Sequence, residues 1–502
     1  MPPLQRPESG TSVRLPPRDA LLGADADVLV VGGGPAGLGA ALGAARAGAD
    51  VILAERYGFL GGTATAALVM PLMSFHNEAR RVRAIDPTGS VRLLPSDHGP
   101  GEPVIAGVLQ LFLDALYRAG GAIAPSQATG YTVPFDPERF KLVALELLDG
   151  AGVRFLFHAL ASGIVGDETP EGVVFETKSG PVVIRARTIV DCTGDGDVAA
   201  AAGARFEVGR EQDGLVQPMT LMFRLVDFDR EQFSAYVDAH PDQWHGVLGL
   251  EELIREAEEA GELDLPRDDL LFFATPHDRE VSVNSTRVSH VLGTDVWDLT
   301  RAESISRRQL RQIVDFLRKR VPGFGESYAA QSGTIIGVRE TRRIVGEYRL
   351  TAKDVLTCGP FEDAIARGSY PIDIHDPQGK DTIIRRLPAG GAYDIPLRCL
   401  LPDGVDRLLV AGRCISGSHE AHSSYRVTPI AMATGHAAGV CAAIAATTGQ
   451  PPRAVDHRAV QLELIRQGAN LRYHTAQEAV TLLTTERIVG DRAARSPERT
   501  AA

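Results

Sequence analysis

The stretch Asp27-Val28-Leu29-Val30-Val31-Gly32-Gly33-Gly34-Pro35-Ala36-Gly37 decides the fold of this chain. Residues 28–31 form an unbroken apolar run, which is typical of a buried parallel strand. The glycines that follow lead into the Ala- and Leu-rich segment 38–47, and this segment predicts a helix that ends at Gly48. Residues 51–54 predict a second strand, so that the segment as a whole predicts a βαβ unit.

The glycines match the dinucleotide-binding pattern, Gly32-x-Gly34-x-x-Gly37. In this pattern the first glycine makes the turn, the second leaves room for a pyrophosphate, and the third lets helix and strand pack closely. The helix then faces the phosphates with free N–H groups and the positive end of its dipole. Glu55 ends the second strand, where an acid holds the ribose hydroxyls. These features together argue against a chance glycine turn, but they do not distinguish NAD from FAD.

Composition excludes several other classes of protein. The 502 residues are 44% hydrophobic and 23% charged, which predicts a globular chain of several domains. The net charge of −12 and the lack of a basic arm argue against nucleic-acid binding. Five dispersed cysteines without a CxxC pair argue against disulfides, iron–sulfur clusters and structural zinc, and they fit a cytoplasmic protein. No signal peptide and no membrane span of about 20 apolar residues is predicted.

Further motifs follow the glycine pattern in order along residues 27–449. They give the sequence a resemblance to the FAD-dependent oxidoreductase family of the glutathione-reductase-type superfamily, with heterodisulfide reductase A-like and, more distantly, fumarate-reductase-like flavoproteins as relatives. The resemblance implies FAD as the cofactor, whereas the Cys-rich cluster motifs of the heterodisulfide reductase relatives are missing. The motifs are Val30-Val31-Gly32-Gly33-Gly34-Pro35-Ala36-Gly37, Glu55-Arg56-Tyr57-Gly58-Phe59-Leu60-Gly61-Gly62, Asp191-Cys192-Thr193-Gly194-Asp195-Gly196-Asp197, Gly337-Val338-Arg339-Glu340-Thr341-Arg342-Arg343 and Leu409-Val410-Ala411-Gly412-Arg413-Cys414-Ile415-Ser416.

The resemblance also implies which residues contact FAD. Gly62 and Thr63 would lie near the pyrophosphate and the flavin, and Arg413 would lie beside the ribityl chain, where many members have an acid instead. The helix that begins at Pro429 would aim its positive end at the flavin. The full set of predicted cofactor-binding residues is Gly32, Gly34, Pro35, Ala36, Gly37, Glu55, Arg56, Gly62, Thr63, Thr193, Gly194, Gly412, Arg413, Pro429 and Ile430.

The pattern of elements predicts a discontinuous domain. Short strand candidates alternate with helices in the middle of the chain, where Thr300-Arg301-Ala302-Glu303 predicts a helix start, and the glycine-rich pattern returns near residue 407. The predicted fold class is therefore α/β, with a discontinuous Rossmann-like FAD-binding domain and an inserted α+β substrate domain. The predicted divisions are a flexible tail 1–24, FAD-binding parts 25–75, 131–215 and 396–450, a loop or cap region 76–130, a substrate or cap domain 216–395, and a C-terminal helical extension 451–502.

Three residues are predicted to be catalytic, and no metal ligand is predicted. His419 could move protons and Arg426 could fix an anionic substrate group, although Arg426 could instead pair with Glu420. Arg339 lies in a charge-dense segment in which one arginine is expected to pair with Glu340 and another could face the substrate; the alternative is an ion network at a domain interface. His76 and His375 are weaker candidates because a lone histidine is more often an ordinary polar residue.

The expected function is hydride transfer between a small-molecule substrate and flavin N5, in a cleft between the two domains. Two alternatives remain open at this point: a binding or assembly subunit with structural or sensory FAD, and a flavin-free NAD(P)-linked dehydrogenase. The chain has one good glycine fingerprint and no CxxxxC pair, so we expect electrons to pass to a partner protein or to oxygen. The sequence leaves a homo-oligomer open.

Overall fold

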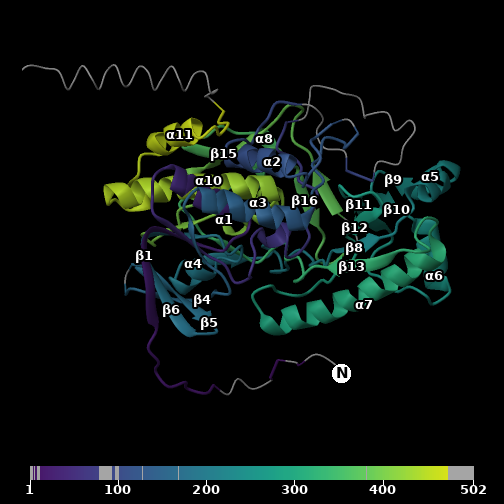
Figure 1. The fold of residues 1–502 in the computed structure, drawn as a ribbon, viewed down its shortest axis with the longest axis horizontal. Helices are drawn as coiled ribbons and strands as arrows, with labels where there is room; N and C mark the ends of the chain where they lie inside the picture. The colour runs from purple at the N-terminus through teal and green to yellow at the C-terminus, as the bar shows by residue number, and fades with distance from the viewer. Residues whose placement is uncertain are drawn as a thin grey trace, which may run out of the picture.

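The computed structural model describes residues 4, 6–7, 12–77, 93–95, 101–126, 128–167, 169–379 and 382–472. These residues form two main sheets, one of seven strands and one of six (Figure 1). The seven-stranded sheet is built from both ends of the chain, and the six-stranded sheet lies between them in the sequence. The α/β fold class predicted from the sequence is therefore confirmed.

The seven-stranded sheet has a parallel part and an antiparallel extension. In the parallel part the order is β3-β2-β1-β6, with β19 on the far side of β6, and in the extension β5 and β4 continue from β6. Val31 is paired with Ala54 on one side and Asp191 on the other, so the carboxyl ends of these strands share one edge. The strands are β1 (Leu21–Val31), β2 (Val51–Ala54), β3 (Arg154–Leu156), β4 (Leu160–Val165), β5 (Gly172–Thr177), β6 (Gly180–Asp191) and β19 (Leu408–Val410).

One predicted boundary in this sheet was wrong. Strand β1 begins at Leu21, inside the range 1–24 that was predicted to be a tail, because its first residues pair with the outer half of β6. Strand β6 is continuous over 12 residues. Its outer half forms the hairpin with β5, whereas its inner half lies between β1 and β19.

Helix α1 begins at the fingerprint and α10 belongs to the last third of the chain, yet the two helices pack directly against each other (Figure 1). A Cβ on Gly435 would lie 1.9 Å from Ala36 O, and one on Gly439 would lie 2.0 Å from Ala40 O. Glycine is therefore required at both positions, because the two backbones touch. The helices of this unit are α1 (Pro35–Arg46), α2 (Val108–Arg118), α3 (Pro137–Gly150), α4 (Asp197–Ala201), α8 (Ala352–Thr357), α9 (His419–Tyr425), α10 (Thr428–Thr448) and α11 (His457–Arg466).

By length and composition alone, α10 could cross a membrane. However, 83% of its most apolar stretch is buried inside the protein, where it contacts α1 and the strands β1 and β6. A buried core helix of a globular unit passes the same test, so this helix is weak evidence for a membrane span.

The six-stranded sheet and its helices form the inserted unit. The sheet is antiparallel, in the order β13-β8-β12-β11-β10-β9, and α7 extends below it in Figure 1. Its core is a cluster of phenylalanines that includes Phe223, Phe228, Phe233, Phe272 and Phe324. The elements are β8 (Phe223–Val226), α5 (Arg230–Ala239), β9 (Trp244–His245), β10 (Leu248–Gly249), α6 (Glu251–Glu259), β11 (Leu270–Ala274), β12 (Glu280–Val283), α7 (Val296–Arg320) and β13 (Tyr328–Ser332).

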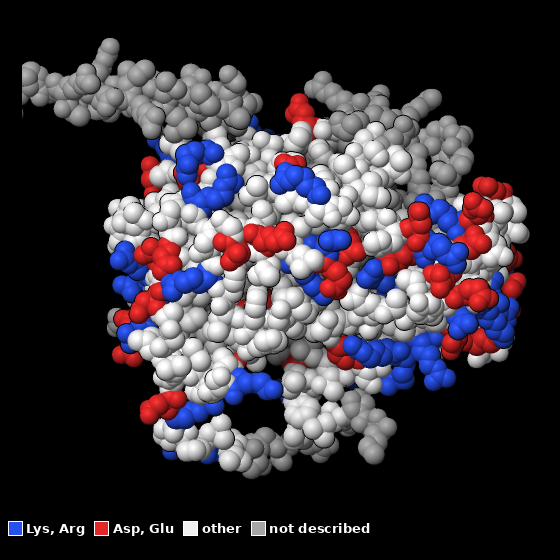
Figure 2. All heavy atoms as spheres, viewed as in Figure 1, with Lys and Arg blue, Asp and Glu red and all other residues white. Residues whose placement is uncertain are grey.

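The predicted start of the long helix was also wrong. Helix α7 begins at Val296, because the Asp295 side chain accepts hydrogen bonds from the N–H groups of Trp297 and Asp298. Thr300 lies inside the helix and its hydroxyl donates to Val296 O instead of capping. On the face shown in Figure 2, Lys and Arg lie among Asp and Glu over this inserted unit. One such contact joins Arg320 to Glu262 at 2.9 Å.

The inserted unit ends earlier than the predicted boundary at residue 395. Strands β15, β16 and β18 contribute Ile365, Ile372, Tyr393 and Ile395 to the core that contains α1 and α10, whereas β17 is exposed and pairs with β16. Because these strands are short and lack a glycine fingerprint, their sequence resembles that of the insert. They are β15 (Ala364–Gly368), β16 (Ile372–His375), β17 (Thr382–Arg385) and β18 (Tyr393–Pro396). In the predicted loop or cap region 76–130, residues 78–92, 96–100 and 127 lie outside the described residues, as do residues 473–502 of the predicted helical extension.

The contact between α1 and α10 predicts an unusual effect of alanine. Gly→Ala inside a helix normally stabilises by about 0.5–1 kcal/mol. We expect Gly439→Ala to destabilise instead, by about 1–3 kcal/mol, because the added methyl group overlaps Ala40 O. Thermal unfolding followed by circular dichroism measures the difference. The control is Gly150→Ala at the end of α3, where an added Cβ meets nothing within 4 Å. Equal melting temperatures for the two variants would contradict the packing argument.

Candidate functional site

Two glycines of the fingerprint are required by the protein itself. Gly32 has φ of +101°, and a Cβ there would lie 2.5 Å from Cys192 O. A Cβ on Gly37 would lie 1.8 Å from Gly32 O. The turn between β1 and α1 thus closes tightly against the end of β6, and no side chain fits at either position.

Gly34 is different, because the protein leaves room beside it. Its φ is −74°, which any residue adopts, and a Cβ would meet only Gly62 Cα, at 3.6 Å. Helix α1 begins here with Pro35 in its first turn and without a side-chain cap. An open space beside an uncapped helix N-terminus fits the pyrophosphate of a dinucleotide. The loop at Gly62 and Thr63 closes against Gly34, since a Cβ on Gly62 would lie 2.6 Å from Gly34 Cα.

Glu55, just after β2, packs against the fingerprint loop. Its buried carboxylate accepts hydrogen bonds from Gly33 N, at 2.5 Å, and from Tyr57 N, at 2.9 Å. Burial raises the pKa of Glu55. Arg56 is exposed, and its guanidinium lies 5.0 Å from the centre of the Tyr57 ring. Glu55 therefore lies just after β2, against the first turn of the fingerprint, and its role as a ribose ligand stays a prediction.

Gly412, in the loop after β19, lies against the beginning of α1. It has φ of +81°, and a Cβ there would lie 2.8 Å from the Ala36 Cβ and 3.7 Å from the Ala431 Cβ. Its N–H donates to Thr434 Oγ1 at 3.1 Å. Like α1, helix α10 has no side-chain cap, and its first turn contains Pro429, which is buried together with Ile430. The beginnings of α1 and α10 are therefore close to one another.

Three other predicted cofactor residues are engaged within the protein. The Thr193 hydroxyl donates to Asp191 Oδ1 at 2.7 Å and accepts from Asp197 N at 3.0 Å. The Arg413 guanidinium donates to Gly194 O, to Val338 O and to Asp195 Oδ1, at 2.9, 2.6 and 2.6 Å. Arg413 thus ties the β6 loop to the segment around Val338. This bonding gives Arg413 a structural role that the sequence did not predict.

Gly34 offers a direct test of the cofactor pocket. We expect Gly34→Ala to fold normally, because the added methyl group meets only one atom, at ordinary contact distance. The affinity for added FAD should fall at least about tenfold, because the methyl group fills the space beside the helix N-terminus. Gly37→Ala should instead lower the melting temperature, because its methyl group overlaps Gly32 O. Fluorescence titration with FAD and thermal unfolding separate the effects. Unchanged FAD affinity in Gly34→Ala would exclude this space as the pyrophosphate site.

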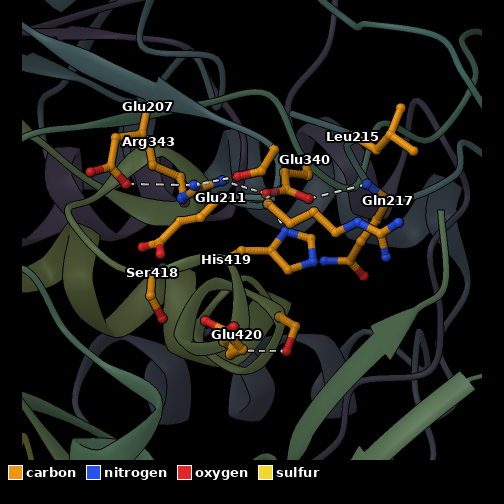
Figure 3. A network of polar contacts seen from close by, with 12 residues as sticks. Glu207, Glu211, Leu215, Gln217, Glu340, Arg343, Ser418, His419 and Glu420 are labelled. Carbon is orange, nitrogen blue, oxygen red and sulfur yellow. Dashed lines mark hydrogen bonds and ion pairs between the residues drawn. The ribbon is translucent and has the colours of Figure 1, made fainter. Parts of the chain in front are cut away.

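A buried network holds His419 in place (Figure 3). The His419 Nδ1 lies 2.9 Å from Glu340 Oε1, and Glu340 is fully buried. Glu340 also accepts from Arg343 Nη1 and, at 3.1 Å, from Gln217 N. Arg343 itself donates to Gly417 O and Gly209 O, at 3.0 and 2.8 Å. The other ring nitrogen, His419 Nε2, is buried without a hydrogen-bond partner.

The structure shows the partners of the two other residues that were predicted to be catalytic, Arg339 and Arg426. Glu340 pairs with Arg343, not with Arg339, which donates to Pro218 O and Thr220 Oγ1 at 2.5 and 2.7 Å. The predicted alternative pair of Arg426 with Glu420 was wrong, because the acid beside Arg426 is Asp373, at 3.8 Å. Arg339 contacts Pro218, whose neighbour Gln217 accepts from His375 N, and Arg426 lies beside Asp373 on the same strand as His375. The structure therefore brings both arginines to the strand that contains His375.

Sequence reasoning missed three residues of this region. Gln217 links the Glu340 network to β16, because its N–H binds Glu340 and its Oε1 accepts from His375 N at 3.3 Å. Asp373 lies on β16, and Arg287 donates to Asp376 O and Gly379 O. No motif marks them, because each comes from a different segment. Among the described residues, no group of three His, Cys, Asp or Glu side chains is arranged to hold a metal ion.

Comparison with known proteins agrees with this geometry. The family model described as FAD-dependent oxidoreductase matches residues 27–464. The chain therefore belongs to the FAD-dependent oxidoreductase family, and FAD is its cofactor. It is an oxidoreductase. None of the curated proteins matches the chain.

Several solved structures resemble the chain at low sequence identity. A geranylgeranyl bacteriochlorophyll reductase-like protein from Thermoplasma acidophilum is 11% identical, with a TM-score of 0.41 over 91% of this chain and 96% of that one. The p-nitrophenol 4-monooxygenase PnpA from Pseudomonas putida is 11% identical, with a TM-score of 0.43 over 88% and 85%. The anhydrotetracycline hydroxylase OxyS from Streptomyces rimosus is 12% identical, with a TM-score of 0.42 over 88% and 66%.

Proposed function

We propose that this oxidoreductase transfers a hydride between a small-molecule substrate and FAD, with His419 as its proton-transfer residue. The observation that carries the proposal is the unpartnered, buried Nε2 of His419, on a ring that Glu340 orients. Bound FAD would supply the two-electron chemistry, with the hydride exchanged at its N5. Removing a hydride from an alcohol or amine also requires removal of a proton, which a positioned imidazole can accept.

The network supports Nε2 as the nitrogen of His419 that would react in this proposal. Glu340 accepts a hydrogen bond from Arg343 and lies within hydrogen-bond distance of His419 Nδ1. When Nδ1 donates to Glu340, Nε2 carries the lone pair that can take a proton. When Nε2 takes a proton, the ring becomes cationic and Glu340 stabilises it at 2.9 Å. Arg343 and Glu340 act as positioning residues in this proposal.

The two uncapped helices support the cofactor side of the proposal. The fingerprint loop and the start of α1 would hold the pyrophosphate, and Glu55 the ribose. The positive end of α10 would face the flavin and stabilise negative charge there. A structural or sensory FAD would not need a proton-transfer group. The unpartnered His419 Nε2 therefore favours an enzyme over a binding subunit.

We also propose two finer points that follow from the sequence. The order of the motifs supports a place in the glutathione-reductase-type superfamily, and the five free thiols support a cytoplasmic location. The family match over residues 27–464 argues against a flavin-free NAD(P)-linked dehydrogenase. We further propose that a partner protein or oxygen completes the electron transfer.

The first test is the visible spectrum of the purified protein. We expect flavin bands, and bleaching of these bands under anaerobic conditions by a substrate found in a panel of small alcohols, amines and acids. His419→Ala should retain the flavin bands but bleach at least about 100-fold more slowly, because proton transfer contributes that much.

The matched control is His240→Ala, which removes an exposed histidine at the end of α5. Its bleaching rate should equal that of the unmodified protein. If His419→Ala bleaches at the unmodified rate, then His419 does not transfer the proton. If the protein neither contains flavin nor takes up added FAD, the proposed reaction is excluded.

A further inference from the structure

The short strand β16 (Ile372–His375) is surrounded by positive charge. Helix α9 packs on it and ends at Arg426. Arg339 donates to Thr220 Oγ1. Arg287 donates to the turn after β16, at Asp376 O and Gly379 O. These arginines belong to three different parts of the chain, and all of them act electrostatically on His375. Burial, reinforced by these positive charges, lowers the pKa of His375 well below its usual value.

In the part of the chain that the structure describes, neither Arg339 nor Arg426 has a close carboxylate partner near β16. The hydrogen bonds of Arg339 go to Pro218 O and Thr220 Oγ1, which are both neutral. Burial, with Arg426 as the next cause, lowers the pKa of Arg339 to about 9, so it remains a cation at neutral pH. Asp373 is the acid closest to Arg426, but it lies 3.8 Å away and accepts from Tyr370 OH at 2.7 Å. The Asp373 carboxylate is thus the acid near both Arg339 and Arg426, and it is not in close contact with Arg426.

Two buried donors at the same place have no hydrogen-bond partner. Arg426 Nε is buried and unpaired, and so is Gln217 Nε2 on a side chain that is only 1% exposed. The Gln217 amide oxygen accepts from His375 N, which fixes the NH₂ group as the unpaired end. A buried donor without a partner costs about 1–3 kcal/mol, more when it is charged. All of these groups donate hydrogen bonds, so the missing partner is an acceptor.

We propose that Arg339, Arg426 and Gln217 bind an oxyanion of the substrate, a carboxylate or a phosphate, and that this oxidoreductase therefore acts on anionic small molecules. The proposal rests on the proposed function, because it assigns the substrate class of the same site. Gln217 N binds Glu340, which orients His419, so the oxyanion site and the proton-transfer residue share one network. A guanidinium pair can hold an oxyanion by charge-assisted hydrogen bonds, which fixes the substrate as well as attracting it.

The first experiment titrates the FAD-bound protein with benzoate, succinate and inorganic phosphate, and with the neutral analogues benzamide and succinamide. Isothermal titration calorimetry and the perturbation of the flavin spectrum measure binding. We expect at least one oxyanion to bind and the amides not to bind. Comparing the carboxylates with phosphate identifies the preferred oxyanion. Equal binding of acids and amides, or no binding of any anion, would overturn the proposal.

Variants locate the site. Arg426→Gln and Arg339→Gln should each raise the dissociation constant of the bound anion about tenfold or more, because each removes a charge-assisted contact. Arg311→Gln is the control, since Arg311 is an exposed arginine on α7 whose side chain is 85% exposed. It should leave the dissociation constant unchanged. Anion binding that is unaffected by Arg426→Gln and Arg339→Gln would overturn the assignment.

The stability of Arg426→Gln separates ligand binding from a structural role. Without an anion, the variant should melt at the same temperature as the unmodified protein or higher, because a poorly paired buried charge is removed. A melting temperature lower by several degrees would mean that Arg426 serves the fold through Asp373, and would overturn the proposal. Bound FAD and bleaching by neutral substrates would survive that outcome, so failure here is distinguishable from failure of the proposed reaction.

Discussion

The direct backbone contact between α1 and α10 is the constraint on which the rest of the site depends. Where Gly435 meets Ala36 O, no side chain separates the helices, and their N-termini converge beside Gly412. Two positive helix ends at one place repel each other, and neither has a side-chain cap. In the proposed cofactor site the pyrophosphate at α1 and the flavin at α10 would relieve this repulsion, so the packing that stabilises the fold also supports binding of a dinucleotide.

The segment Gly337–Arg343 connects the cofactor side of the protein to the substrate side. Val338 O accepts from Arg413, whose neighbour Gly412 touches α1, whereas Glu340 orients His419. Arg339, between them, turns toward Thr220 in the inserted unit. Within three residues, Val338 to Glu340, the chain therefore contacts the proposed cofactor site and the proposed substrate site. Charges are tolerated here because almost every one has a partner of opposite sign or a carbonyl group.

The sequence predicted local elements well and long-range contacts poorly. The helix that follows the fingerprint and the start of α10 within one residue of Pro429 were both predicted, because each depends on neighbouring residues. The role of Arg413 was not, since its partners Gly194 and Val338 are distant in the sequence. The grouping of Gln217 with Arg339 and Arg426 depends on how three segments meet at β16. No local pattern records such a meeting.

Because α1 packs against α10, helix α1 can reach its final packing only after α10 has been synthesised. Residues 35–46 leave the ribosome early, but their partner helix ends only at residue 448. Until then the apolar surface of α1 lacks its cover, and strand β6 lacks its neighbour β19. The FAD site is therefore completed only when the chain is almost finished. A truncated nascent chain exposes this surface to chaperones and proteases and cannot be protected by early binding of the cofactor.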